Sequence, residues 1–176
     1  FCEQLTLEGI DNWRLPNPYE LMTLSSFSET DQNMIHELFQ DSSSANYLSS
    51  VTSLGFFDRG IGFTFFKDTG LTLYEKNYPY RVRCVSGTEL KPIYNLVDNN
   101  IVEDKSNGLI WNINDSGDKL TWDGAISYCE NLTLSNFSDW RLPNAKELAS
   151  IIDYNQYNPA INTQYFNITE NDGYFW

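Results

Sequence analysis

The chain has 176 residues, and its 24 acidic and 11 basic side chains give a net charge of −13 and an isoelectric point near 4.2. A field of that sign repels phosphate backbones and anionic headgroups, which argues against nucleic acid or a membrane surface as a partner. Hydrophobic residues make up 41% of the chain, enough for packed cores, and no apolar run approaches the roughly 20 residues of a membrane span.

The first predicted element is a helix that begins at Asn17. Glu20 follows three residues later, a spacing that predicts a capping box, and Pro18 stands at the first helical position. Pro16 holds the residue before it extended, so the preceding side chains can turn into a core. The predicted structural motif is Trp13, Arg14, Leu15, Pro16, Asn17 and Glu20.

Residues 25–50 are rich in Ser, Asn and Asp, which predicts a long loop with one helical turn at residues 34–39. From Gly60 the pattern changes to β structure. Strands at residues 61–66, 71–75 and 80–85, with a turn at residues 67–70, predict a meander that closes a domain. A short linker is expected at residues 88–92.

The second half predicts a strand at residues 108–112 and then an amphipathic helix at residues 121–132, with Thr121 as N-cap. One face of that helix is apolar and is expected to point into the core: Trp122, Ala125, Ile126, Cys129 and Leu132. A second capping box starts another helix at Asn144, and residues 153–176 are expected to form loops. The structural motif of this half is Trp140, Arg141, Leu142, Pro143, Asn144 and Glu147.

These two motifs are copies of each other. Residues 2–24 and 129–151 align without a gap, and 12 of 23 positions are identical. Such self-similarity at a fixed spacing indicates a tandem repeat. We expect two incomplete units: the C-terminal part of one at residues 1–87 and the N-terminal part of the next at residues 93–176.

The repeat also predicts how the three cysteines pair. Cys2 and Cys84 stand at opposite ends of the first unit, and we expect them to form a disulfide; two buried free thiols are the alternative. By the same spacing, Cys129 should pair with a residue near position 211. A disulfide indicates an oxidising compartment, so the expected location is extracytoplasmic: secreted, periplasmic or on the cell surface.

Several further segments, taken with the repeat, resemble a known bacterial family. They are Gly-Leu-Ile-Trp at 108–111, Leu-Thr-Trp-Asp at 120–123, Asn-Pro-Ala-Ile-Asn at 158–162, Tyr-Leu-Ser-Ser at 47–50 and Tyr-Arg-Val-Arg-Cys-Val at 80–85. The chain resembles the DUF1566 family, named for the C-terminal domain of the Legionella collagen-like protein. The resemblance implies an α+β, C-type-lectin-like fold, with a small twisted antiparallel sheet flanked by two helices in each unit and a disulfide from the first helix to the last strand.

The resemblance also implies an exported bacterial surface module, often present in tandem. One member of the family is an adhesin that binds sulfated glycosaminoglycans, but this acidic chain lacks the clustered basic residues that such a ligand requires. The sugar-binding triplets of calcium-dependent lectins are absent as well. We therefore expect no cofactor and no metal.

No catalytic constellation stands out. The single histidine, His36, has no neighbour at metal-ligand spacing and is interpreted as a surface residue. A loose calcium-loop pattern at residues 112–123 is interpreted as a polar loop that leads to Thr121. Arg14 and Arg141 are expected to form structural ion pairs. Aromatic side chains in expected loops or edge strands are the candidate ligand-binding residues: Tyr74, Tyr78, Tyr80, Tyr154, Tyr157 and Tyr165.

The resulting expectation is a non-enzymatic surface module for adhesion or ligand binding, which contacts an unknown glycan or protein through loops on a lectin-like scaffold. Two alternatives remain. One is a structural spacer in a fibre or stalk. The other is a relative of the formylglycine-generating enzymes, which share the fold but need reactive cysteines in the active site.

Overall fold

The computed structural model describes residues 1–25, 46–65 and 70–169, and the chain divides into two compact units, Phe1–Leu90 and Lys91–Trp176. The boundary falls within the expected linker at residues 88–92. The helical turn expected at residues 34–39, His36 and most of the turn at residues 67–70 lie outside the described residues. Each unit is considered by itself, and both combine helices with antiparallel strands, so the fold class is α+β.

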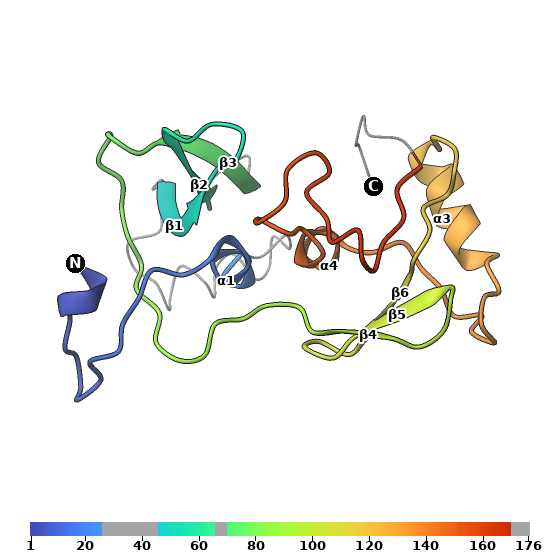
Figure 1. Ribbon diagram of the computed structural model, residues 1–176, viewed down its shortest axis with the longest axis horizontal. Coiled ribbons are helices and arrows are strands. Elements are labelled where there is room, and N and C mark those ends of the chain that lie inside the picture. The colour runs from blue at the N-terminus through green and yellow to red at the C-terminus, as the bar shows by residue number, and fades with distance from the viewer. Residues whose placement is uncertain (26–45, 66–69, 170–176) are drawn as a thin grey trace. The chain divides into compact units, whose positions relative to one another are not determined.

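The first unit packs one helix against a three-stranded sheet (Figure 1). The 3-10 helix η1 (Cys2–Gln4) and the α-helix α1 (Pro18–Thr23) precede strands β1 (Asn46–Thr52), β2 (Arg59–Thr64) and β3 (Gly70–Glu75), which are antiparallel in the order β1-β2-β3. The buried side chains come from both layers, and they include Leu21, Met22, Tyr47 and Phe63.

Strand β1 corrects the long loop expected at residues 25–50. Tyr47 and Ser49 point to the buried side of the sheet, and a serine at a core position hides the alternation that identifies a strand in the sequence. Ser49 is accommodated because its hydroxyl donates a hydrogen bond to the carbonyl of Ile61 at 2.6 Å. A buried hydroxyl satisfied in this way costs little.

The third strand of the expected meander, at residues 80–85, does not form a regular strand. Arg81 makes a parallel bridge with Tyr47, whereas Val85 makes an antiparallel bridge with Arg14. Because the segment changes partner within four residues, no continuous ladder develops. The sheet instead takes β1 as its third member, and the 80–85 segment connects the sheet to the residues before α1.

Gly62 in β2 allows close packing within the first sheet. A Cβ atom at this position would lie 2.5 Å from the carbonyl oxygen of Tyr47 and 2.6 Å from the ring of Tyr74. The ring of Tyr74 also contacts that of Tyr80, with centroids 4.9 Å apart. Glycine at this position therefore lets an aromatic pair lie against the strand.

The second unit contains strands β4 (Tyr94–Leu96), β5 (Ile101–Asp104) and β6 (Leu109–Asn112), followed by helices α3 (Trp122–Glu130) and α4 (Ala145–Ser150). Its core consists of Val102, Ile113 and Phe166, with Tyr94, Trp111, Ile151, Ile161 and Tyr165 packed against it. Asp104 is fully buried and accepts hydrogen bonds from the backbone N–H of Ile93 and Ser106, among others, so its burial is compensated.

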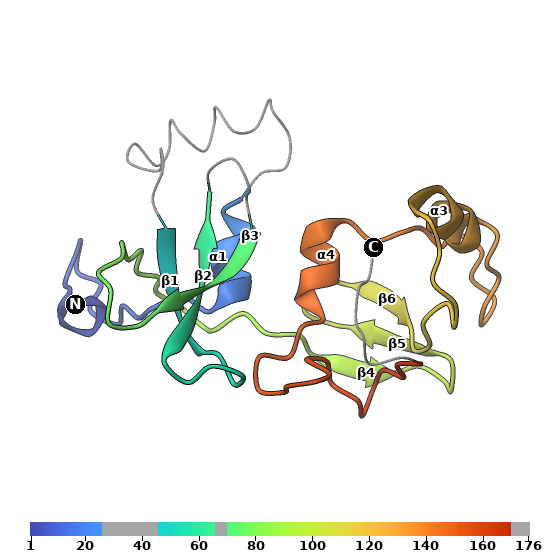
Figure 2. The ribbon, with the colours of Figure 1, turned by 90° about the horizontal axis from the view of Figure 1, so that it is seen from above.

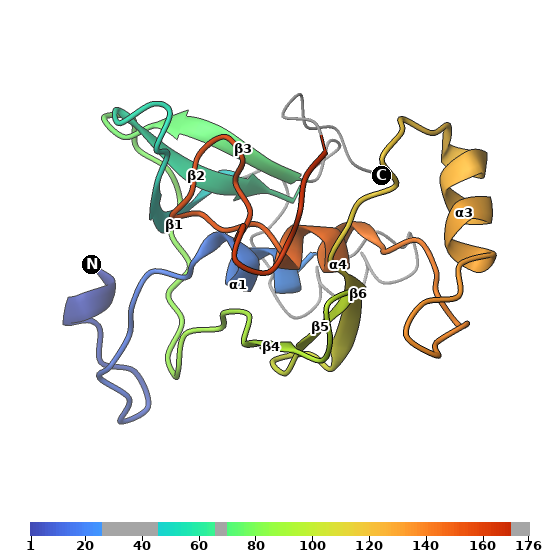
Figure 3. The same ribbon diagram turned by 45° about the vertical axis from the view of Figure 1, so that its right-hand side comes forward.

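The helix expected at residues 121–132 is present as α3, and Thr121 caps it by accepting a hydrogen bond from the N–H of Gly124 at 3.2 Å. The expected burial of its apolar face is observed only in part, since Ile126, Cys129 and Leu132 are half-buried. Only Ala125 is buried, and Trp122 is 56% exposed. Figures 2 and 3 show the ribbon of α3 standing apart from the strands and from α4.

No helix among the described residues is long and apolar enough to cross a membrane.

Candidate functional site

The repeated motif forms a compact hydrogen-bonded unit before α1. The side chain of Asn17 accepts a hydrogen bond from the N–H of Glu20 at 2.8 Å, and the carboxylate of Glu20 accepts one from the N–H of Asn17 at the same distance. Arg14 donates two hydrogen bonds to the carboxylate oxygens of Glu20, at 2.6 and 2.7 Å. This bidentate pair fixes the chain that enters the helix.

The second copy repeats this geometry. Asn144 and Glu147 form the same capping box, and Arg141 donates to Glu147 at 2.6 and 2.7 Å. The indole N–H of Trp140 donates to the carbonyl of Phe137 at 3.1 Å, and that of Trp13 donates to the carbonyl of Ile10 at 2.9 Å. The local sequence is therefore sufficient to form the motif, because both copies adopt the same geometry in different surroundings.

The two copies of the motif differ in their exposure to solvent. In the first unit Asn17 is 7% and Glu20 is 6% exposed, whereas Asn144 is exposed and Glu147 is half-buried. The side chain of Arg14 is 30% exposed and that of Arg141 is 59% exposed. The cover in the first unit comes partly from the segment after Cys84, where the backbone N–H of Leu90 donates to Glu20 at 3.0 Å.

These contacts shift the pKa values of both carboxyl groups. Burial raises the pKa of Glu20, but hydrogen bonds from Arg14 and from the N–H groups of Leu90 and Asn17 outweigh burial and hold that pKa below its ordinary value. For Glu147 the hydrogen bond from Arg141 is the largest influence and also lowers the pKa. Both groups are therefore stabilised in their ionised form.

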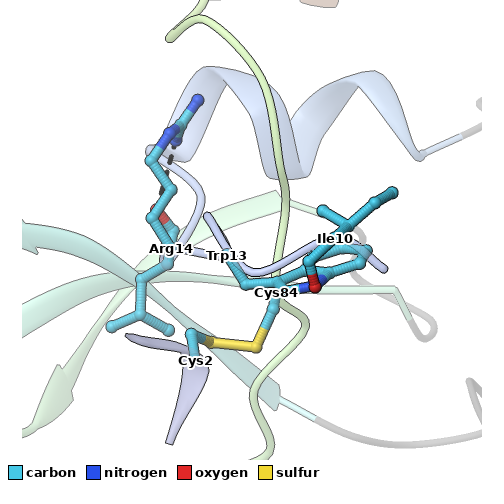
Figure 4. Close-up of a disulfide and its surroundings, with 6 residues drawn as sticks. Cys2, Ile10, Trp13, Arg14 and Cys84 are labelled. Carbon is cyan, nitrogen blue, oxygen red and sulfur yellow. Dashed lines mark hydrogen bonds between the residues drawn. A yellow bond between two sulfur atoms is a disulfide. The ribbon is translucent and has the colours of Figure 1, made fainter. Parts of the chain in front are cut away.

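The expected disulfide is present. Cys2 and Cys84 are joined with their Cα atoms 5.6 Å apart, across 82 positions of sequence. Figure 4 shows the bond beside Trp13, Ile10 and Arg14, where the residues before α1 meet the closing segment. Cys129 is a half-buried free thiol, and burial together with the charge of Glu130 raises its pKa. The disulfide indicates an oxidising environment outside the cytoplasm.

Most of the candidate tyrosines pack inside their units. Tyr74 and Tyr80 contact each other, and burial raises the pKa of Tyr74. Tyr165 packs against Tyr94, with ring centroids 5.1 Å apart, and burial raises the pKa of Tyr154 well above its ordinary value. Two of the six candidates are exposed, namely Tyr78 at 65% and Tyr157 at 67%. Three of the six candidates belong to the first unit and three to the second.

A cluster that the sequence reasoning did not identify lies at one end of the first sheet. The turn between β1 and β2 exposes Leu54 by 39%, Phe56 by 51% and Phe57 by 75%. This turn is tied to the one after β3, because Lys76 donates hydrogen bonds to the carbonyls of Asp58 and Phe57. Tyr78 stands on that neighbouring turn. We call Leu54, Phe56, Phe57 and Tyr78 the aromatic end.

The aromatic end had a signal in the sequence. Leu54-Gly-Phe-Phe is an apolar run at a turn, where polar residues are the rule. The guanidinium of Arg59 lies over the ring of Phe56, 5.1 Å from its centroid, and orients that ring. An exposed apolar cluster of this kind indicates an interaction surface more often than a lone exposed side chain does.

The described residues hold no group of side chains placed to bind a metal ion. Within residues 1–25, 46–65 and 70–169, no three His, Cys, Asp or Glu side chains converge as metal ligands. In the loop before α3, the side chain of Asn112 accepts from the N–H of Asn114, and Asn114 accepts from the amide of Asn167. Two side-chain oxygens of the loose calcium pattern, those of Asn112 and Asn114, thus accept hydrogen bonds within the unit.

Comparison with known proteins places these features in a family. The Lcl C-terminal domain matches residues 1–86 and 100–176, which together cover nearly the whole chain. The break between the two matches contains the boundary between the compact units. No significant match was found among curated proteins or among solved structures. The chain therefore belongs to the Lcl C-terminal domain family, a family of bacterial surface-protein modules, and carries two stretches of it in tandem.

Proposed function

We propose that this chain is a non-catalytic, exported binding module that holds a protein ligand at the aromatic end of its first unit, on a C-type-lectin-like scaffold. The observation that carries the proposal is the exposure of Phe56 and Phe57 on a turn that hydrogen bonds hold in place. Rigid aromatic side chains bury a large area with little loss of conformational entropy, and they dominate the energetics of many interfaces.

The chemistry of the aromatic end favours a polypeptide over a sugar. Phenylalanine and leucine have no polar group with which to orient a hydroxyl-rich ring, whereas they fit apolar pockets on another protein. The strongly acidic chain also favours ligands that are neutral or basic over sulfated polymers. A glycan is the competing outcome of the binding test.

The scaffold proposal rests on the arrangement within each unit. Antiparallel strands, short helices and, in the first unit, a disulfide between an early helix and the closing segment agree with a lectin-like plan. The disulfide also supports export. An enzyme of the formylglycine-generating type would need reactive thiols, whereas Cys2 and Cys84 are bonded to each other and the pKa of Cys129 is raised.

The test is binding of the purified chain to a panel of host extracellular-matrix proteins and to a glycan array. Phe57→Ala should weaken binding to the selected protein by about tenfold or more, as is typical when an aromatic anchor is truncated. Its melting temperature should stay unchanged, because the side chain is 75% exposed.

Tyr157→Ala is the matched control, since Tyr157 is 67% exposed but belongs to the second unit. Its binding should equal that of the wild type. Binding that Phe57→Ala leaves intact, or that appears on glycans alone, would contradict the proposed site. Blank results on both panels would favour the structural spacer.

A further inference from the structure

Four Asn-x-Ser/Thr tripeptides occur in the second unit, at Asn114, Asn131, Asn136 and Asn167. This tripeptide is the acceptor of N-linked sugars, which are attached to the side-chain amide of the asparagine. The structure distinguishes the four, because a transferase that acts on the folded chain needs access to that amide and to the hydroxyl two residues later.

Two of the tripeptides each have one of these groups engaged. The amide of Asn131 donates a hydrogen bond to the carbonyl of Ser127 at 2.7 Å, at the C-terminal end of α3, where helix carbonyls need donors. In the tripeptide of Asn114 the hydroxyl of Ser116 donates to the carbonyl of Asp118 at 2.7 Å. Transfer of a sugar at either position therefore competes with a hydrogen bond of the fold.

The tripeptide at Asn167 has both groups engaged. Its amide donates to the side-chain oxygen of Asn114 at 2.9 Å. The hydroxyl of Thr169 donates to the carboxylate of Asp115 at 2.6 Å, and the N–H of Thr169 donates to the same carboxylate at 2.7 Å. An enzyme that used Asn167 would have to detach residues 167–169 from the loop before α3, which costs these hydrogen bonds.

The tripeptide at Asn136 is accessible at both positions. Asn136 and Ser138 are exposed, and neither side chain makes a hydrogen bond to another described residue. The backbone that carries them is nevertheless fixed. Leu134 and Phe137 exchange two backbone hydrogen bonds, at 3.0 and 2.9 Å, and so close a two-residue turn with Ser135 and Asn136 at its tip.

The first copy of the repeat shows that this turn forms without the tripeptide. Residues 7–10 close the same turn with the same pair of hydrogen bonds. Gly9, at a φ of +78°, stands 127 positions before Asn136, which has a φ of +65°. Glycine adopts positive φ without strain. The first copy also has Asp11 in place of Ser138. The turn therefore needs neither the acceptor asparagine nor the hydroxyl.

We propose that Asn136 is an N-glycosylation site, and that its donor is a sugar activated at C1 by a diphosphate. The amide nitrogen Nδ2 of Asn136 forms a bond to C1, and the bond between C1 and the phosphate oxygen breaks. The diphosphate leaves with the electron pair of that bond, and one amide proton passes to a base of the transferase. The site belongs to the second unit and does not depend on the binding proposed for the aromatic end.

The neighbourhood of the turn suits a sugar. The ring of Phe137 is 37% exposed and packs edge-on against that of Trp140, with centroids 6.2 Å apart. A sugar on the preceding residue adds a bulky, hydrated group next to this aromatic pair, and its apolar ring face packs on an exposed aromatic face. Glycosylation thus covers apolar surface on an exported module.

The experiment offers the folded full chain, with its Cys2–Cys84 disulfide intact, to N-glycosyltransferases in two arms. One arm supplies a nucleoside diphosphate sugar and the other a lipid diphosphate oligosaccharide, so the labelled arm identifies the donor. Occupancy is mapped by mass spectrometry of proteolytic fragments. Asn136 should be occupied about fivefold or more above each of the other three asparagines, because each of those competes with at least one hydrogen bond. Chain recovered from the cells that export it should carry sugar at the same residue.

Variants and an unfolded control test the reasoning. Asn136→Gly, which restores the residue of the first copy, should abolish this label and leave the melting temperature unchanged. Ser138→Ala should also abolish it, whereas Thr133→Ala, the same change at the exposed hydroxyl of the Asn131 tripeptide, should not. Reduced and denatured chain should lose the preference for Asn136.

The proposal is overturned if Asn136 carries no sugar in either arm, or if the four asparagines are equally occupied in the folded chain. A label that survives Ser138→Ala, or a preference for Asn136 that persists in the denatured chain, would overturn it as well, because the fold would then not select the site.

Discussion

Replacing Glu20 with glutamine tests how much the remote segment adds to the repeated motif. The carboxylate of Glu20 receives hydrogen bonds from Arg14, from the N–H of Asn17 and from the N–H of Leu90, at 2.6 to 3.0 Å, and the residue is 6% exposed. Glutamine keeps the shape but removes the charge and turns one acceptor into a donor. Losing buried hydrogen bonds to a charged group should cost about 2–4 kcal/mol.

The matched substitution is Glu147→Gln, in the second copy of the same motif. Glu147 makes the same bonds to Arg141 and to the N–H of Asn144, but Arg141 is 59% exposed and no counterpart of Leu90 is bound among the described residues. An exposed pair with a cap should contribute only about 0.5–1 kcal/mol.

The assay is chemical denaturation and calorimetry of the two variants beside the wild type, with hydrogen exchange of the Leu90 amide as a local readout. Glu20→Gln should lower the melting temperature of its unit by on the order of 10 °C, and the Leu90 amide should lose protection. Glu147→Gln should shift the melting temperature only slightly. An equal or larger loss from Glu147→Gln would refute the reasoning, because it would mean that burial by the 84–90 segment contributes nothing.

Three further outcomes are expected. Cys84→Ser should destabilise the first unit by up to about 4–5 kcal/mol, measured as a fall in its denaturation midpoint that reducing agent reproduces in the wild type. Gly62→Ala should cost more than about 2 kcal/mol in denaturation, because its Cβ would meet the backbone of β1 and the ring of Tyr74, whereas Gly60→Ala would meet mainly a flexible leucine methyl at 3.3 Å and should cost less. Acid titration of stability should show the contribution of Glu20: its folded pKa lies below the unfolded one, so the stabilisation is complete above the unfolded pKa and disappears as pH falls through the folded pKa. A stability that rises on acidification through that range would contradict this assignment.

Most parts of the fold that were predictable depend on neighbours in sequence, and the Cys2–Cys84 disulfide is the exception. Asn17 and Glu20 are three residues apart, and an α-helical first turn places them within hydrogen-bond reach. The same spacing predicted α4, and Thr121 marked the start of α3. The Cys2–Cys84 disulfide followed from the position of both cysteines within one repeat.

The errors share a cause. Strand β1 was missed because Ser49 occupies a buried position and is satisfied by a carbonyl on the neighbouring strand. Residues 80–85 were predicted to form a strand from their sequence pattern, yet they pair with two different segments. Trp122 was expected in the core and is exposed. In each case the outcome depends on what lies opposite in space, which a periodic pattern does not contain.

The aromatic end illustrates the same limit for the candidate site. Six tyrosines were chosen because they fall in expected loops or edge strands, but exposure depends on packing. Tyr74 and Tyr80 cover each other, whereas Tyr78 is 65% exposed on the turn that Lys76 ties to Phe57. Hydrogen bonds from Lys76 bring two turns together that are about 20 positions apart in sequence.

The two copies of the motif show which properties the local sequence determines and which depend on the tertiary structure. Arg14 with Glu20, and Arg141 with Glu147, are six residues apart, so the local sequence alone determined their pairing, and both copies form it at the same distances. How deeply the first copy is buried, only the tertiary structure decided. That burial depends on a segment some 70 to 80 residues away, and the attraction between groups so distant acts only after folding has brought them together.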